Sequence, residues 1–210
     1  MITGTVYGVM LNVAGGVEAL GEAVNAAPYK APPVAPILYI KTANTFLADG
    51  GTVVVPAGMD ELEVQPTLGL VFGRTATRVT EAEALEYVAA LVPVIDVCVP
   101  HASLYRPAVR HRCRDGFLPV GKPVPWPAGA NAFDIGVAVN GEDRGGFSTA
   151  DLVRSIPKLI AEVTDFMTLS PGDVLLVGLS NASPRARAGD QVTARVSGVG
   201  QVSVRLEAEQ

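Results

Sequence analysis

Cysteine and histidine are scarce in this sequence, since each occurs only twice among 210 residues. Cys98 and Cys113 are too few for a disulfide framework and lack the paired spacing of a zinc site. This pattern predicts a reducing compartment inside the cell, and we expect a cytoplasmic protein. His101 and His111 are the two histidines, so a Ser-His-Asp or Cys-His site would need one of them. A reactive thiol at Cys113 and an inert cysteine remain two interpretations of that residue.

Charge is also scarce, because only 18% of the residues are charged and the net charge is −5. An acidic chain argues against non-specific binding to nucleic acid. The mean hydropathy of +0.32 suggests an apolar surface, and we therefore expect an oligomer. The N-terminus lacks the basic start and apolar core of a signal peptide, and apolar runs are interrupted before they reach membrane-spanning length. We therefore expect no membrane partner.

The order of apolar runs and turns predicts a β-rich α+β fold that forms one domain over residues 1–210. Short helices are expected over 81–91 and 152–167, and Pro157 should distort the first half of the second helix. Asn140-Gly141 predicts a type I′ hairpin. Helical spacing is also present over 13–26. We expect strands at 5–11, 37–41, 52–55, 68–72, 92–99, 135–139, 174–178, 191–196 and 201–206.

Two polar segments are candidates for binding an anion. In the first, Lys41 ends a predicted strand and is followed by Asn44 and Thr45, which could hold a carboxylate by charge and directional hydrogen bonds. A surface lysine before an ordinary turn explains the same pattern. The second segment is basic and contains Arg106, Arg110, Arg112 and Arg114 with His111 and Asp115. Its arginines could clamp a dicarboxylate, or they could form surface ion pairs in a turn.

Asp96 stands in an apolar strand, where an unpaired carboxylate is costly to bury. The acid must therefore meet an arginine from the basic segment or serve as a metal ligand. On another apolar strand, Gln65 and Thr67 alternate so that both side chains face one side.

Several short motifs together make this chain similar to the fumarylacetoacetate hydrolase family. They are Pro28-Tyr29-Lys30-Ala31-Pro32-Pro33, Lys41 with Asn44-Thr45, Gly73-Arg74-Thr75-Ala76-Thr77-Arg78-Val79, Tyr105-Arg106-Pro107, Cys113-Arg114-Asp115-Gly116-Phe117, Thr149-Ala150-Asp151-Leu152 and Asp165-Phe166-Met167-Thr168-Leu169-Ser170-Pro171-Gly172-Asp173. The resemblance covers nearly the whole chain. It implies a mixed β-roll with a few flanking helices, as in the fumarylacetoacetase C-terminal domain, commonly dimeric and with a magnesium ion that chelates a 2-oxo acid.

Matching the family's motifs position by position, the resemblance implies a role for seven side chains of this sequence. Arg114 and Asp115 match the family's catalytic Arg-Asp-Gly element, while Lys41, Asn44, Thr45 and Arg112 match substrate-binding positions. Asp96 matches the third metal ligand. The other two ligands, a Glu-x-Glu pair in the family, fall on Gln65 and Thr67. Oxygen ligands with little charge hold magnesium weakly, so we expect weak or absent metal binding.

Within the family, the chain most resembles the metal-site-poor half of an isomerase/decarboxylase of 4-hydroxyphenylacetate breakdown. The resemblance implies decarboxylation of 5-oxopent-3-ene-1,2,5-tricarboxylate and isomerisation of 2-hydroxyhepta-2,4-diene-1,7-dioate. The expected partners are a small dicarboxylate or 2-oxo acid, and either a second copy or an intact homologous subunit. One alternative is a catalytically silent scaffold or dicarboxylate-binding partner, and another is a hydrolase that cleaves a C–C bond of an acylpyruvate.

Overall fold

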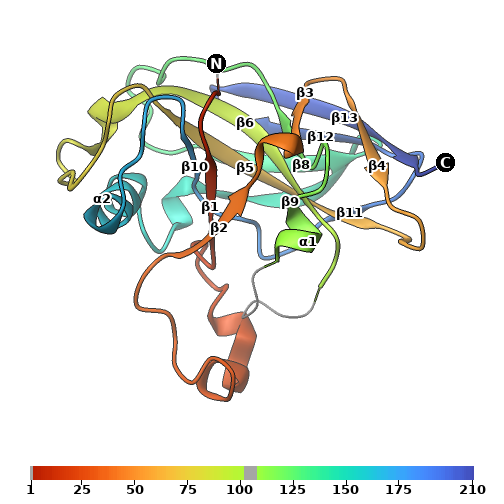
Figure 1. Ribbon diagram of the computed structural model, residues 1–210, viewed down its shortest axis with the longest axis horizontal. Helices are drawn as coiled ribbons and strands as arrows, with labels where there is room; N and C mark the ends of the chain where they lie inside the picture. The colour runs from red at the N-terminus through yellow and green to blue at the C-terminus, as the bar shows by residue number, and fades with distance from the viewer. Residues whose placement is uncertain (1, 102–107) are drawn as a thin grey trace.

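The computed structural model describes residues 2–101 and 108–210, and these residues form two β-sheets (Figure 1). The larger sheet comprises β1 (Val6–Met10), β2 (Ile37–Lys41), β3 (Phe46–Ala48), β5 (Leu62–Phe72), β6 (Val88–Cys98), β7 (Leu118–Val120), β10 (Val174–Leu176) and β11 (Arg185–Ala186). Its strand order is β2-β1-β10-β5-β6-β7-β3, and β11 pairs with β5. The smaller sheet has the order β4-β13-β12-β8-β9, with β4 (Thr52–Val55), β8 (Asp134–Val139), β9 (Glu142–Ser148), β12 (Gln191–Val196) and β13 (Gly200–Ala208). The β-rich α+β fold is therefore confirmed.

Strands β5 and β6 form the centre of the larger sheet and are antiparallel. Nearly all side chains of both strands are buried, which explains why the sequence here is a continuous apolar run instead of an alternating pattern. Gln65 lies opposite Asp96 in the register, and Thr67 lies opposite Val94. The few polar side chains of this pair are thus held at fixed positions inside the protein.

The apolar core has three parts. Leu68 and Phe72 of β5 pack with Leu159 and Val163 of α2 (Ile156–Phe166). Nearer the start of β5, Val64 packs with apolar side chains of β6 and of the smaller sheet, among them Ile95, Val97, Val192, Ala194, Val202 and Val204. Val64 and Leu68 are four residues apart on one strand and point to the same face, so α2 and the smaller sheet cover the same face of the larger sheet. A third cluster, which includes Val71, Val92 and Leu176, lies on the opposite face.

The helices differ from the sequence prediction in two places. The expected helix over 81–91 is wrong, because only a 3₁₀ turn, η3 (Ala84–Tyr87), precedes β6. Val88 and Leu91 instead pair with β5, and this tertiary pairing outweighs the helical composition of the segment. The expected distortion at Pro157 is also wrong, since Ser155 caps α2 and places the proline in the first turn, where its missing N–H group costs nothing.

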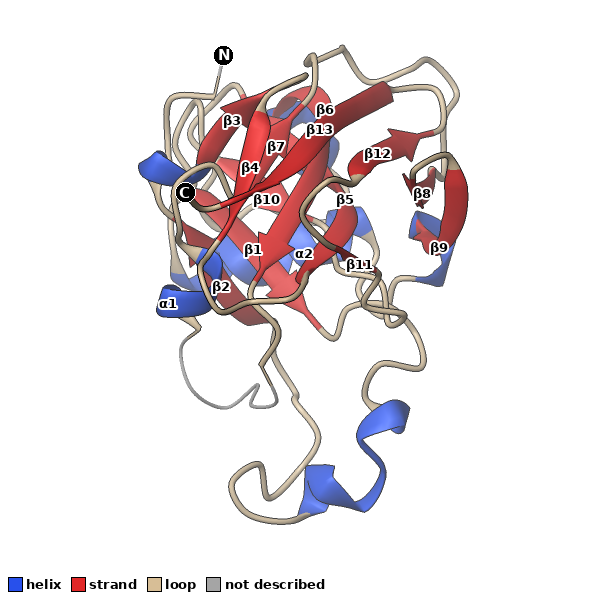
Figure 2. Cartoon of the chain, turned by 90° about the vertical axis from the view of Figure 1, so that its right-hand side faces the viewer, coloured by secondary structure: helices blue, strands red, loops and turns tan. Residues whose placement is uncertain are grey.

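Other short elements complete the chain. They are α1 (Val109–Arg112), η1 (Glu18–Asn25), η2 (Ala43–Thr45) and η4 (Thr149–Asp151). The hairpin between β8 and β9 is confirmed, because Asn140 and Gly141 have φ of 53° and 84°, as a type I′ turn requires. The helical segment expected over 13–26 is a 3₁₀ element broken at Gly21. This element and the loop that follows it project from the body of the sheets (Figures 1 and 2).

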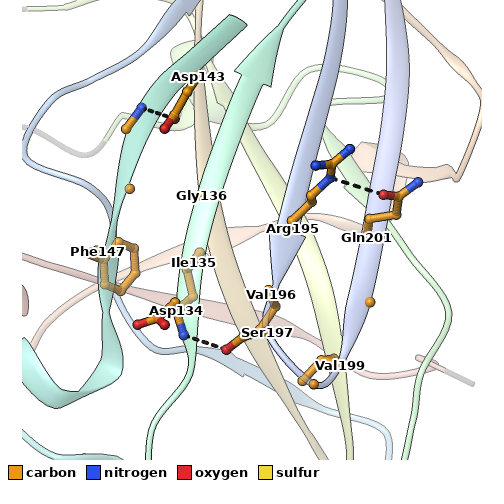
Figure 3. Close-up of a pocket in the computed structure, with 14 residues that line it drawn as sticks. Asp134, Ile135, Gly136, Asp143, Phe147, Arg195, Val196, Ser197, Val199 and Gln201 are labelled. Carbon is orange, nitrogen blue, oxygen red and sulfur yellow. Dashed lines mark hydrogen bonds between the residues drawn. The ribbon is translucent and has the colours of Figure 1, made fainter. Parts of the chain in front are cut away.

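The smaller sheet carries a broad hollow of about 880 Å³ on its surface (Figure 3). Asp134, Phe147, Arg195 and Val199 are among the residues that line it. The hollow shares no residue with the polar groups of β5 and β6. Within residues 2–101 and 108–210, none of the helices combines the length and hydrophobicity of a membrane span.

Candidate functional site

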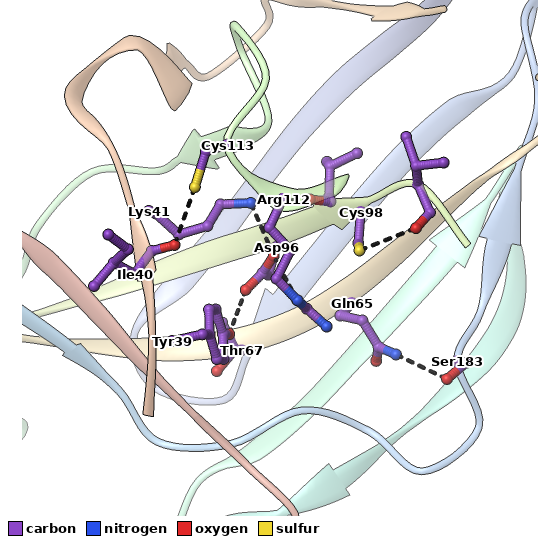
Figure 4. A network of polar contacts seen from close by, with 12 residues as sticks. Tyr39, Ile40, Lys41, Gln65, Thr67, Asp96, Cys98, Arg112, Cys113 and Ser183 are labelled. Atoms are coloured by element: carbon purple, nitrogen blue, oxygen red, sulfur yellow. Dashed lines mark hydrogen bonds and ion pairs between the residues drawn. The ribbon is translucent and has the colours of Figure 1, made fainter. Parts of the chain in front are cut away.

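The polar cluster inside the larger sheet is centred on the carboxylate of Asp96 (Figure 4). Lys41 Nζ donates to Asp96 Oδ1 at 3.0 Å, and Arg112 Nη1 donates to the same oxygen at 3.2 Å. The hydroxyl of Tyr39 donates to Oδ2. Lys41 also donates to the carbonyl oxygen of Val97 at 2.9 Å. Both oxygens of the carboxylate are therefore already engaged by the protein.

Alternation along a strand and a short helix place these groups together. Tyr39 and Lys41 are two residues apart on β2, and side chains two apart on a strand point to the same face. Arg112 ends α1, and its guanidinium lies over the Tyr39 ring at 4.6 Å from the ring centroid. The sequence predicted that Asp96 would meet an arginine or a metal, and the structure shows the arginine. The participation of Tyr39 was missed, although its spacing from Lys41 could have revealed it.

Burial and charge act against each other at this cluster. Burial raises the pKa of Asp96, but the charges of Lys41 and Arg112 and the hydrogen bonds from Tyr39 and Lys41 outweigh it, so the pKa lies below its ordinary value. Burial also raises the pKa of Tyr39, and the negative charge of Asp96 raises it further. The tyrosine hydroxyl therefore keeps its proton and donates a hydrogen bond to the carboxylate. Burial lowers the pKa of Lys41, while the charge of Asp96 and its hydrogen bond act in the opposite direction. With Lys41 protonated, Lys41, Arg112 and Asp96 together carry two positive charges and one negative charge.

These residues do not fit a divalent metal ion. A hard cation needs several oxygen ligands, and protein sites usually supply free carboxylates among them. Asp96 already forms ion pairs with two cations. The hydroxyl of Thr67 donates a hydrogen bond to the carbonyl oxygen of Gly178 at 2.6 Å. Gln65 adds a neutral amide oxygen. Over residues 2–101 and 108–210, no group of three or more His, Cys, Asp or Glu side chains is arranged to hold a metal.

A cavity of about 240 Å³ lies beside the cluster and is bounded partly by the segment that leads into η1. Gln65 and Arg112 line it, and both are only 3% exposed. The other lining residues are Met10, Leu11, Gly16, Ala19, Leu20, Glu63, His101, Leu179, Ser180, Asn181 and Ser183. Gln65 Oε1 and Arg112 Nε are buried and have no hydrogen-bond partner among the described residues. For this reason the smaller cavity, and not the larger hollow of Figure 3, is the candidate site.

The remaining predicted site residues lie in a second polar group near the surface. Asn44 Nδ2 donates to Asp115 Oδ1 at 2.6 Å, and Thr45 is buried with its hydroxyl donating to the carbonyl oxygen of Thr42 at 2.7 Å. Arg114 Nε donates to the carbonyl oxygen of Arg110 at 3.3 Å. The structure thus brings Lys41 and Arg112 together at Asp96 but places Arg114 and Asp115 outside the residues that line the cavity. Arg106 and Tyr105 lie outside the described residues.

The two histidines lie close together beside the cavity, a contact that could not be predicted from their positions in the sequence. Their ring centroids are 4.8 Å apart. Burial lowers the pKa of His111, and the neighbouring His101 and Arg110 lower it further. Among the cysteines, burial raises the pKa of the Cys98 thiol to about 12, so this sulfur stays protonated. Cys113 Sγ donates to the carbonyl oxygen of Ile40 at 3.3 Å.

Comparison with protein families and curated proteins gives a consistent result. The family described as fumarylacetoacetate (FAA) hydrolase C-terminal matches residues 5–207. A 4-hydroxyphenylacetate degradation bifunctional isomerase/decarboxylase of Escherichia coli is 37% identical over 195 residues, which are 93% of this chain and 45% of that protein. The chain thus spans less than half the length of that relative. Oxaloacetate tautomerase FAHD1, a mitochondrial protein of Arabidopsis thaliana, is 27% identical over 203 residues, or 93% of this chain and 87% of that protein.

Solved structures share the fold across the whole chain. A 5-carboxymethyl-2-hydroxymuconate delta-isomerase from Mycobacterium smegmatis has a TM-score of 0.85 at 23% identity and covers 100% of this chain and 78% of its own. A fumarylpyruvate hydrolase from Pseudomonas aeruginosa, in complex with Mn²⁺ and pyruvate, has a TM-score of 0.83 at 20% identity, with 99% and 91% of the two chains covered. These structures confirm the fold, and the family match with the curated relatives confirms the resemblance inferred from short motifs.

Proposed function

The chain belongs to the fumarylacetoacetate hydrolase C-terminal family, and on this basis we propose that it is a metal-free subunit of an isomerase/decarboxylase in 4-hydroxyphenylacetate catabolism. The reactions are those that the resemblance to the isomerase/decarboxylase implies, isomerisation of 2-hydroxyhepta-2,4-diene-1,7-dioate and decarboxylation of 5-oxopent-3-ene-1,2,5-tricarboxylate. Support comes from the 37% identity to the E. coli isomerase/decarboxylase. The proposed partner is a homologous subunit that carries the carboxylates this chain lacks.

The ion pairs of Asp96 support the proposal that this subunit binds no metal. Asp96 is the only carboxylate of the three ligand positions, and Lys41 and Arg112 contact it at 3.0 and 3.2 Å. A divalent cation would have to displace two fixed positive charges and would gain only one charged ligand. The ion pairs are fully buried, so solvent screens them little.

The chain's own residues support binding of an acid. Lys41 and Arg112 leave one positive charge in excess over Asp96, and Arg112 also lines the cavity. Glu63 also lines the cavity, so the guanidinium of Arg112 is the group that would attract a carboxylate of the substrate. Arg114 and Asp115 as a catalytic pair, with Asn44 and Thr45 as binding residues, remain part of the proposal.

A second candidate function is a catalytically silent partner that supplies an interface and binds a dicarboxylate. The hydrogen bonds that occupy both carboxylate oxygens of Asp96 favour this silent partner. A site without a metal lacks the family's means of stabilising an enolate. In this alternative the cavity beside Gln65 binds the acid without turning it over.

The proposal is tested with the purified chain, an intact homologous subunit, and an equimolar mixture of the two. We expect the chain alone to be inactive with or without Mg²⁺ or Mn²⁺, and light scattering to show that it forms a complex with the intact subunit. The complex should have a higher kcat/KM than the intact subunit alone. Equal activity within a stable complex would support the silent partner. Activity of the isolated chain that a chelator abolishes would contradict the metal-free proposal.

A further inference from the structure

Three dipeptides of this sequence are prone to the same spontaneous reaction, in which a backbone nitrogen attacks the side chain of the residue before it. They are Asp49-Gly50, Asp115-Gly116 and Asn140-Gly141. Glycine has no side chain to hinder its nitrogen, so a five-membered succinimide ring closes more readily at such pairs than at other sequences. The surroundings of the three pairs differ in the structure, and this difference decides which of them can react.

At the two aspartates the attacking nitrogen is already engaged. Gly50 N donates to the carbonyl oxygen of Ser203 at 2.8 Å, and Gly116 N donates to the carbonyl oxygen of Asn44 at 3.0 Å. Both aspartate carboxylates also accept a hydrogen bond from the same partner residue. An ionised carboxylate is in addition a poor electrophile. Ring closure is therefore disfavoured at both aspartates in the folded chain.

The Asn140-Gly141 pair forms the turn between β8 and β9, and its nitrogen is not engaged in this way. Gly141 N has no hydrogen-bond partner among residues 2–101 and 108–210. The side chain of Asn140 is held instead. Its Nδ2 donates to Asp190 Oδ1 at 2.8 Å, and its Oδ1 accepts from Gln191 N at 2.9 Å. These two contacts fix the carboxamide against the start of β12, while the nitrogen that could attack it is unoccupied.

The geometry points to a covalent modification site, and we propose that Asn140 is the residue at which this protein deamidates, at a rate set by the hydrogen bonds to Asp190 and Gln191. Gly141 N loses its proton and attacks Cγ of Asn140, and the amide nitrogen leaves as ammonia. Water then opens the succinimide at either carbonyl and yields aspartate or isoaspartate. Ring closure requires the carboxamide to leave its two partners, so the folded chain reacts only through local opening of the turn.

The product fits this position poorly. The backbone N–H of Arg187 and the amide of Asn140 lower the pKa of Asp190, so Asp190 is ionised. Deamidation replaces the donor that faces Asp190 by a second carboxylate. Isoaspartate also adds a carbon atom to the main chain of a two-residue turn, which disrupts its type I′ geometry. The modification therefore loosens the β8–β9 hairpin from β12 at one end of the smaller sheet (Figure 2).

Incubation of the whole chain at mildly alkaline pH, folded and in urea, tests the inference. Peptide mapping that resolves aspartate from isoaspartate locates and times each modification. We expect Asn140 to be the first of the three pairs to react in the folded chain, and to react at least about tenfold faster in urea, where its two hydrogen bonds are lost. Equal rates at Asn140 in the two states, no reaction there in urea, or an earlier reaction of Asp49 or Asp115 in the folded chain would overturn the inference.

Asp190→Ala removes the acceptor of Asn140 Nδ2 and should raise the rate at Asn140 about fivefold, in a chain that circular dichroism shows to be folded. Asp165→Ala is the matched control, because Asp165 is exposed on α2, and it should leave the rate unchanged. A rate that Asp190→Ala does not change, or that both substitutions raise equally, would overturn the role of Asp190. If Asp190→Ala fails to fold, the comparison of the folded wild type with the wild type in urea still decides the question.

Discussion

Arg112 donates to Asp96 at 3.2 Å, and both side chains are almost completely buried, with 4% and 0% of their areas exposed. Lys41 donates to the same oxygen, so internal cations engage the carboxylate that the family resemblance assigns to the third metal-ligand position. The negative charge that a metal would contact at that position is thus already paired within the chain. Four predictions about stability and metal binding follow from the groups described above.

Replacing Asp96 by asparagine should destabilise the protein strongly. The substitution leaves Lys41 and Arg112 buried without a counter-charge, and breaking a buried ion pair in this way costs about 3–5 kcal/mol. Urea unfolding followed by circular dichroism measures the loss. Asp115→Asn is the matched control, since Asp115 is exposed and asparagine retains the oxygen that Asn44 contacts. A loss at Asp96 no larger than that of the control would refute this account of the cluster.

Lys41→Met should cost less than Asp96→Asn. The methionine has a similar volume and leaves Asp96 paired with Arg112, so the remaining charges balance one to one. We expect a loss below about 2 kcal/mol, mainly from the carbonyl oxygen of Val97, which loses its donor. The same urea titration gives the comparison. If the two substitutions proved equally costly, Lys41 would be the main partner of Asp96, contrary to the shared arrangement described here.

His111 should make the folded protein less stable as the pH falls below 6.5. Burial and the neighbouring His101 and arginines lower its pKa in the folded state from 6.5. Between the folded and unfolded pKa values the unfolded chain binds the extra proton, so the free energy of unfolding rises with pH across this window. We expect His111→Gln to flatten that rise in thermal melts between pH 5 and 7. An unchanged slope in the variant would assign the pH dependence to other groups.

The sequence predicted most of the fold because many of its strands are apolar and bounded by turn residues. Asn140-Gly141 specified a hairpin from two residues alone, since both must adopt positive φ. The segment 81–91 was predicted wrongly, because Val88 and Leu91 are placed by their partners on β5, which local composition does not report. Pro157 was misjudged for a different reason. Helix α2 begins directly after its N-cap, Ser155, so Pro157 lies in the first turn and does not distort the helix. The sequence did not show where the helix begins.

The candidate site could be predicted in part. The cost of burying Asp96 implied a cationic partner, and Arg112 is one of its two partners. The role of Lys41 was expected to be substrate binding, but its contact with Asp96 depends on how β2 and β6 are placed across the sheet. The open atoms of Gln65 and Arg112 could not be predicted from sequence, because hydrogen-bond satisfaction depends on the orientation of each side chain.

Titration of the chain with Mn²⁺ and Mg²⁺ by calorimetry tests the central claim, that internal cations take the place of a metal, most directly. Gln65→Glu combined with Thr67→Glu is the comparison variant, because it restores two carboxylates beside Asp96 and should bind the metal more tightly than the wild type. For the wild type, the account predicts binding no tighter than about millimolar, as for sites with few carboxylates. Stoichiometric binding of either ion by the wild-type chain at micromolar concentration would contradict it.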